Sequence, residues 1–122
     1  MIQDNFSIVR GDTWTETWTL TDDDGLPANV AGAKFWMTLK NGYTDADPGV
    51  LQLSSPSSGI TIVDAANGVV KLRISAAQSA ALAALTYFYD IQMKTTDAEG
   101  DVVTTLAKGR VTFESDVTNT TA

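Results

Sequence analysis

The stretch Thr13–Thr21, with the sequence TWTETWTLT, decides the fold. Threonine occupies every odd position, and the even positions carry two tryptophans, a glutamate and a leucine. Because side chains alternate between the two faces of a β-strand, Trp14 and Trp18 share one face and are expected in the core. Glu16 interrupts this apolar face, which is typical of a strand near a sheet edge. The stretch therefore predicts an edge strand with an aromatic inner face and a threonine outer face.

The composition of the whole chain favours the same structural class. Of the 122 residues, 17 are Thr, 10 are Val and 6 are Ile. These β-branched side chains are restricted in helices and pack well on a pleated sheet. The length fits one domain, and neither an internal repeat nor a linker divides it. We expect a single domain over residues 1–122, with a core over about 8–118 and a polar C-terminal tail that begins at Ser115.

Further segments alternate in the same way or are bounded by turn residues. They are residues 33–40, Val50–Leu53, Ile60–Val63, Val69–Ile74, Tyr87–Thr95 and Val102–Glu114. The pair Asn67-Gly68 tolerates positive φ and predicts a hairpin, and Asp97–Asp101 is expected to connect a second one. About seven strands at this spacing indicate an all-β, antiparallel sandwich or barrel.

One helix is expected after the first hairpin. Ser75 and Gln78 have the spacing of a capping box, in which each side chain satisfies a backbone N–H at the helix start. Alanine-rich sequence continues to Leu85. We predict two or three helical turns across an open end of the β core, with Leu82 and Leu85 buried.

The charge and the missing residue types exclude several functions. The chain has no Cys and no His, so it has no disulfide, no Ser-His-Asp triad and no Cys or His metal site. A net charge of −7 argues against a nucleic-acid partner. The weakly polar stretch Ala76–Leu85 is too short for a membrane span. We therefore expect no enzyme, no cofactor and no membrane partner.

The candidate interface residues lie on two strands. Trp36 falls on the strand face that also carries Lys34 and Lys40, opposite the apolar inner face. Exposed aromatic rings are enriched at protein interfaces, so a protein partner is favoured over a stacked sugar ring, which stays open as an alternative. Thr15 and Thr17 form either a solvated sheet face or a pairing surface for a neighbouring chain.

Two motifs have a functional and a structural interpretation. Asp22–Asp24 and the pair Asp45 and Asp47 offer oxygen ligands for calcium, but aspartate is also expected in turns for backbone reasons. Arg10–Asp12 spells an integrin-binding tripeptide, yet Gly11 is more simply explained as a tight bend before the tryptophan strand. We expect no metal site and a structural role for the tripeptide.

The order of several short motifs resembles a family of phage proteins. The motifs are Arg10-Gly11-Asp12-Thr13, Asp24-Gly25-Leu26-Pro27, Val30-Ala31-Gly32-Ala33, Ile60-Thr61-Ile62-Val63 with Asn67-Gly68, the segment Ser75–Leu85, Tyr87-Phe88-Tyr89-Asp90-Ile91-Gln92, Gly109-Arg110-Val111-Thr112-Phe113 and Asp116-Val117-Thr118. This order is similar to that in the N-terminal domain of baseplate upper proteins of tailed bacteriophages. The likeness spans about residues 8–118.

The resemblance implies an immunoglobulin-like β-sandwich and a structural role in a virion. In that family the module docks a receptor-binding or fibre apparatus and assembles as an oligomer. Family members commonly continue into further domains, whereas this sequence ends with the sandwich. The resemblance therefore implies a homo-oligomeric adaptor of the tail or baseplate, or a decoration protein of the capsid, with other virion proteins as partners. A carbohydrate-binding or calcium-assisted adhesion module is the alternative.

Overall fold

The computed structural model describes residues 5–42, 44–46, 49–55 and 58–116 as two β-sheets, one short α-helix and one 3-10 turn. The larger sheet has the strand order β1-β8-β7-β3-β4, with β1 (Phe6–Val9), β8 (Gly100–Glu114), β7 (Thr86–Asp97), β3 (Lys34–Lys40) and β4 (Leu51–Ser54). The smaller sheet has the order β2-β6-β5, with β2 (Trp14–Thr19), β6 (Val69–Ile74) and β5 (Ile60–Asp64). The predicted all-β sandwich with one short helix is confirmed.

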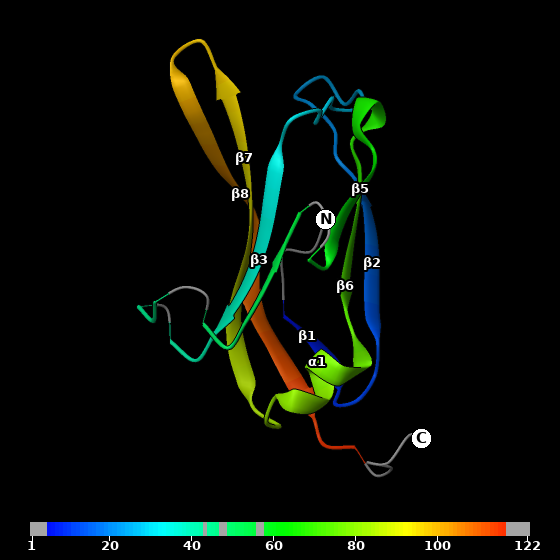
Figure 1. The fold of residues 1–122 in the computed structure, drawn as a ribbon, viewed down its shortest axis with the longest axis vertical. Helices are drawn as coiled ribbons and strands as arrows, with labels where there is room; N and C mark the ends of the chain where they lie inside the picture. The colour runs from blue at the N-terminus through cyan, green and yellow to red at the C-terminus, as the bar shows by residue number, and fades with distance from the viewer. Residues whose placement is uncertain (1–4, 43, 47–48, 56–57, 117–122) are drawn as a thin grey trace.

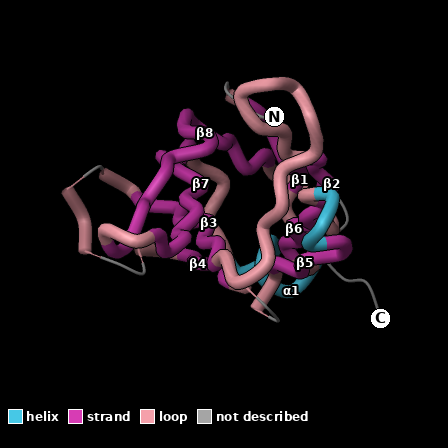
Figure 2. The backbone as a smooth tube through the Cα atoms, turned by 90° about the horizontal axis from the view of Figure 1, so that it is seen from above, coloured by secondary structure: helices cyan, strands magenta, loops and turns pink. Residues whose placement is uncertain are grey.

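The two sheets form two layers with the core between them (Figures 1 and 2). The core consists of the side chains that alternation turns inward, among them Phe35, Met37 and Leu39 of β3 and Val70, Leu72 and Ile74 of β6, all at most 2% exposed. Burial of such side chains is the main favourable contribution to folding. The hairpin of β7 and β8 extends past the rest of the sandwich at one end (Figure 1).

The tryptophan strand β2 lies at the edge of the smaller sheet, as Glu16 predicts. Trp18 is 5% exposed, and its indole Nε1 donates to Glu16 Oε1 at 2.9 Å. Trp14 is half-buried and stacks on Phe6 with ring centroids 5.3 Å apart. The inward glutamate is thus explained, because its carboxylate satisfies the N–H of the buried indole.

Strand β1 is not predicted by the sequence, because four residues are too few for alternation to stand out. Phe6–Val9 pairs in parallel with Val111–Glu114, and all other strand pairs are antiparallel. Phe6 and Ile8 turn inward and pack on the core. The strand thus covers one end of the β8 edge and adds the Phe6 ring between Trp14 and Tyr89.

The corner after β1 fixes the helix to the sandwich. The Arg10 guanidinium donates to the carbonyl oxygens of Leu82 and Ala80 and pairs with Asp116 at 3.3 Å. The Gly11 N–H donates to Oγ of Ser79, which is fully buried. Gly11 has a φ of 86°, so the tight bend predicted for Arg10–Asp12 is confirmed. The arginine of the tripeptide is therefore engaged within the fold.

The predicted hairpin of β5 and β6 is confirmed, with a short 3-10 helix (η1, Ala65–Asn67) in its connection. Gly68 ends this helix at φ 69° and ψ 27°, in the left-handed region. Its carbonyl oxygen accepts from Leu20 N–H at 2.9 Å. A Cβ at this position would lie 2.6 Å from the Ala28 carbonyl oxygen and 2.8 Å from that of Leu20, so only glycine fits.

The helix α1 (Ala76–Ala81) is shorter than the sequence predicts. Its capping box is present as expected, with Gln78 N–H donating to Ser75 Oγ and Ser75 N–H donating to Gln78 Oε1. The helix ends at Leu82, which is buried. The prediction that Leu85 is buried is wrong, since its side chain is 54% exposed. Leu85 is anchored instead through its carbonyl oxygen, which accepts from Phe113 N–H at 2.9 Å.

Candidate functional site

The candidate site is the outer face of the larger sheet, which the strand register builds from β3, β7 and β8. Alternation turns Lys34, Trp36, Thr38 and Lys40 of β3 away from the core. In the register, Trp36 lies opposite Gln92 of β7, and directly opposite residues share a face. The sequence therefore places Trp36 and its two lysines correctly on the outer side, where Trp36 is half-buried.

Positive charge gathers on this surface although the protein as a whole is acidic. The register brings together five of the eight basic side chains, and we call their surface the basic face: Lys34, Lys40, Lys94, Lys108 and Arg110. Three carboxylates share it, those of Asp90, Asp101 and Glu114. Three basic and twelve acidic side chains remain for the rest of the chain. The basic face therefore has a charge of opposite sign to its surroundings, which favours acidic partners.

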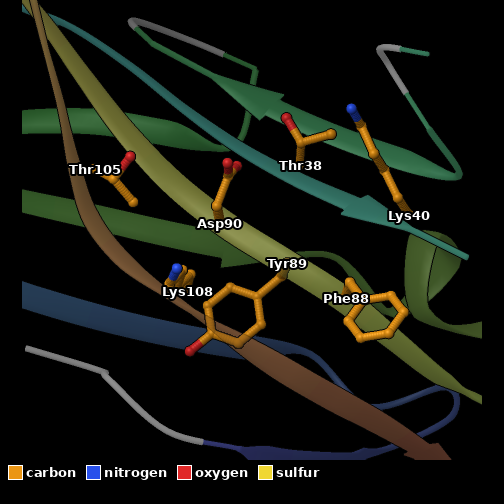
Figure 3. A pocket seen from close by; sticks show the side chains of 7 residues that line it. All are labelled: Thr38, Lys40, Phe88, Tyr89, Asp90, Thr105 and Lys108. Atoms are coloured by element: carbon orange, nitrogen blue, oxygen red, sulfur yellow. The ribbon is translucent and has the colours of Figure 1, made fainter. Parts of the chain in front are cut away.

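Two neighbouring hollows run across the basic face, and both are lined by Thr38, Lys40 and Asp90. The first has a volume of about 290 Å³ and extends to Phe88 and Lys108, as Figure 3 shows. The second has a volume of about 420 Å³ and extends the other way, along β3 and β4 past Trp36. The side chains of four neighbouring strands thus form one shallow, uneven surface.

Contacts between the side chains hold parts of the basic face in place. The Arg110 guanidinium lies 5.3 Å from the centroid of the Phe88 ring, and Gln52 Nε2 donates to Thr38 Oγ1 at 3.0 Å. Near the hairpin end, Lys94 Nζ lies 3.1 Å from Asp101 Oδ2. The hydrogen bonds from Lys94 and Thr96, together with the lysine charge, lower the pKa of Asp101 below its ordinary value. These contacts reduce the ordering that binding would require.

The structure does not bring the two predicted interface segments together. Thr15 and Thr17 are exposed on the outer face of β2, in the smaller sheet, opposite Arg73 and Lys71 of β6. Since β2 and β3 belong to opposite layers of the sandwich (Figure 2), these two threonines lie on the other side of the sandwich from Trp36. Thr15 and Thr17 belong to a separate, threonine-rich surface.

Sequence reasoning missed the part of the site that β7 and β8 contribute. Phe88 and Lys94 follow from alternation once Tyr87, Tyr89 and Ile91 are assigned to the core. Lys108 and Arg110 follow from alternation with the buried Val111 and Phe113, but their places opposite Asp90 and Phe88 require the register. The register shifts between Ile91 and Gln92, where β8 has one extra residue. Asp101 lies beyond this irregularity, so the alternation near Val111 does not predict its outward position.

The aspartates proposed as calcium ligands serve the local backbone. Asp22 Oδ1 accepts from the N–H groups of Asp24 and Leu26, at 2.9 and 3.0 Å. Asp45 Oδ2 accepts from Gly42 N–H at 3.0 Å, and Asp47 lies outside the described residues. Within the described part of the chain, no group of three or more acidic, Cys or His side chains is arranged to hold a metal ion. These hydrogen bonds are typical of aspartate in turns.

Comparison with solved structures supports the fold. The chain is similar to the N-terminal domain of ORF48 of phage TP901-1, with a TM-score of 0.51 and 14% identity over 93% of this chain and 85% of that one. It also matches AggA, the major subunit of aggregative adherence fimbriae type I of Escherichia coli, at 14% identity over 91% and 90% of the two chains, but a TM-score of 0.35 is too low to support an argument. No protein-family model and no curated protein matches the sequence. At this identity the phage likeness bears on the fold alone.

One further observation concerns membranes. Among the described residues, no helix has the length and apolar character needed to cross a bilayer.

Proposed function

We propose that this chain is a non-enzymatic structural protein of a tailed-bacteriophage virion, in which it docks to other virion proteins. Its place is the tail or baseplate as an oligomeric adaptor, or the capsid surface as a decoration protein. The motif order and the fold likeness to a phage domain support the phage assignment. The absence of His and Cys supports a role without catalysis.

The observation that carries the proposal is the basic face itself. It combines the half-buried ring of Trp36 with five cations on a protein whose remaining surface is acidic. Aromatic and basic side chains in this combination are typical of protein interfaces, where rings act as anchors and charges select the partner. We infer that the partner presents an acidic surface that covers Trp36.

The virion assignment is tested by mass spectrometry of purified particles of the phage that encodes this chain. We expect the chain at a copy number comparable to that of the other tail or capsid proteins. Particles that lack it while carrying those proteins would contradict the proposal. Particles of a mutant phage without the gene should lose an identifiable part of the tail or a surface feature of the capsid.

A carbohydrate-binding module is the second candidate, and one hollow of the basic face favours it. This hollow combines the Trp36 ring with the polar side chains of Thr38, Gln52 and Gln92, which suit a sugar ring and its hydroxyl groups. A glycan array discriminates the two functions. Binding that is lost in Trp36→Ala and retained in Thr17→Ala, on the opposite sheet, would support the sugar site.

A further inference from the structure

We propose that two copies of this chain pair through the edge of β8 that faces away from β7, antiparallel to one another, to form one continuous sheet. This surface is the edge of the larger sheet rather than its basic face. The inference adds a specific mode of self-association to the proposed function. It shares Lys108 and Arg110 with the basic face but does not depend on a location in a virion.

Strand β8 is much longer than β1, the strand that pairs with it on that edge. The pairing with β7 runs from Gly100 to Thr112, whereas β1 pairs only with Val111–Glu114. Arg110 N–H is satisfied by the side chain of Asn5 at 3.0 Å. Among the described residues, no strand lies beside Gly100–Gly109 on this side. A long open edge of this kind is a template for another strand.

A hollow beside this edge leads toward the core. It has a volume of about 390 Å³ and lies between β2 and the larger sheet, where its walls include Trp18, Leu20, Val30, Met93 and Leu106. A second hollow, of about 370 Å³, follows the edge from Thr105 to Lys108. Strand β1 does not reach this part of β8. A strand added here would cover apolar side chains of the hollow, and their burial favours pairing.

Among the described residues, no other strand supports the end of the β7–β8 hairpin. Pairing with β3 ends at Lys94, so the ribbon beyond it consists of two strands only (Figure 1). Val102 is 38% and Val103 is 59% exposed there. A two-stranded ribbon is marginally stable alone, whereas pairing with a second copy yields four strands.

The charges along the edge indicate that a second copy of the chain binds there. They also determine the direction of its β8 strand. Acidic side chains cluster at the hairpin turn, among them Asp97 and Glu99, and basic side chains at the far end of the open edge, namely Lys108 and Arg110. Antiparallel pairing of two identical edges places each acidic turn beside the basic end of the other copy. Both contacts form at once because a two-fold interface is self-complementary. Parallel pairing would bring like charges together.

Charge reversal with mixing tests this arrangement on the full-length chain by analytical ultracentrifugation. We expect the unaltered chain to dimerise, and Glu99→Lys alone or Lys108→Glu alone to raise the dissociation constant about tenfold, since each creates two repulsive contacts. An equimolar mixture of the two variants should dimerise like the unaltered chain, because both contacts become attractive again. Lys71→Glu on the smaller sheet, with the same change in charge, should have no effect.

Hydrogen exchange of the β8 amides provides the second measurement, and circular dichroism confirms that each variant is folded. The amides of Gly100–Gly109 should gain protection as protein concentration rises. A monomer at every concentration, or a dimer that neither reversal weakens, would overturn the proposal. If the amides are protected to the same degree at every concentration, a segment of the same chain covers the edge. This result would also overturn the proposal.

Discussion

Arg110 and Phe88 form a cation–π contact across β8 and β7, with 5.3 Å between the guanidinium carbon and the ring centroid. The two residues lie directly opposite one another in the register, which places both on the outer side of the larger sheet. This pair defines one end of the basic face, as Lys94 and Asp101 define the other. The surface is thus a product of strand pairing, because its cations come from β3 and from the β7–β8 hairpin, which are far apart in the sequence.

Trp36→Ala is predicted to weaken binding strongly while lowering the stability of the fold only slightly. Trp36 is half-buried on the outer face, so its loss should lower the free energy of unfolding by about 1 kcal/mol, against about 3–5 kcal/mol for Trp18→Ala in the core. Incorporation into particles should fall at least tenfold, as expected for an aromatic anchor. Urea denaturation and quantitative mass spectrometry of particles measure the two effects. Normal incorporation of a folded Trp36→Ala protein would show that Trp36 is not part of the interface.

Arg10→Ala is predicted to destabilise the fold through the helix end. The guanidinium satisfies two carbonyl oxygens of the helix end and pairs with Asp116. Loss of hydrogen bonds from a charged group should cost about 2 kcal/mol, or roughly 8 °C in Tm. Calorimetry provides the measurement, with Arg73→Ala, at an exposed position of β6, as a control that should change stability by less than about 0.5 kcal/mol. Equal effects of the two variants would contradict a structural role for Arg10.

Gly68→Ala is predicted to be more harmful than Gly25→Ala. Both glycines have positive φ, 69° and 79°, so both substitutions strain the backbone by about 1 kcal/mol. At Gly68 the new Cβ would also lie 2.6 Å from a carbonyl oxygen, whereas nothing lies within 4 Å at Gly25. We expect a total loss of about 3 kcal/mol at Gly68. Chemical denaturation of both variants isolates the steric contribution, and equal losses would show that the hairpin connection is not constrained.

The pKa of Asp101 is predicted to depend on Lys94 more than on Lys34. A hydrogen bond and the charge of Lys94 lower this pKa, and Lys34 contributes only a small electrostatic effect. Lys94→Gln should therefore raise the pKa of Asp101 clearly, and Lys34→Gln only slightly, in a carboxyl-carbon NMR titration. Because the folded pKa is below the unfolded one, the ion pair stabilises the hairpin above the unfolded pKa, and this contribution disappears as pH falls through the folded pKa. A larger effect of Lys34→Gln would contradict the observed pairing.

The sequence predicts the strands whose alternation extends over several residues, and with them the outward position of Trp36, Lys34 and Lys40. It does not predict β1, which is short and is held by parallel pairing with the far end of the chain. It also overestimates the helix, because local alanine propensity continues toward Leu85 while tertiary contacts end the helix at Leu82. The full basic face depends on the register of β7 with β8 and its irregularity near Gln92, which are non-local properties.

The central claim is that the basic face docks to another virion protein, and lysine crosslinking of intact particles tests it most directly. The chain carries its own internal control, since Lys34, Lys40, Lys94 and Lys108 lie on the basic face and Lys71 lies on the outer face of the opposite sheet. Mass spectrometry should find crosslinks to a different virion protein predominantly at the four basic-face lysines. Crosslinks to other virion proteins from Lys71 alone, with none from Lys34, Lys40, Lys94 or Lys108, would contradict the claim.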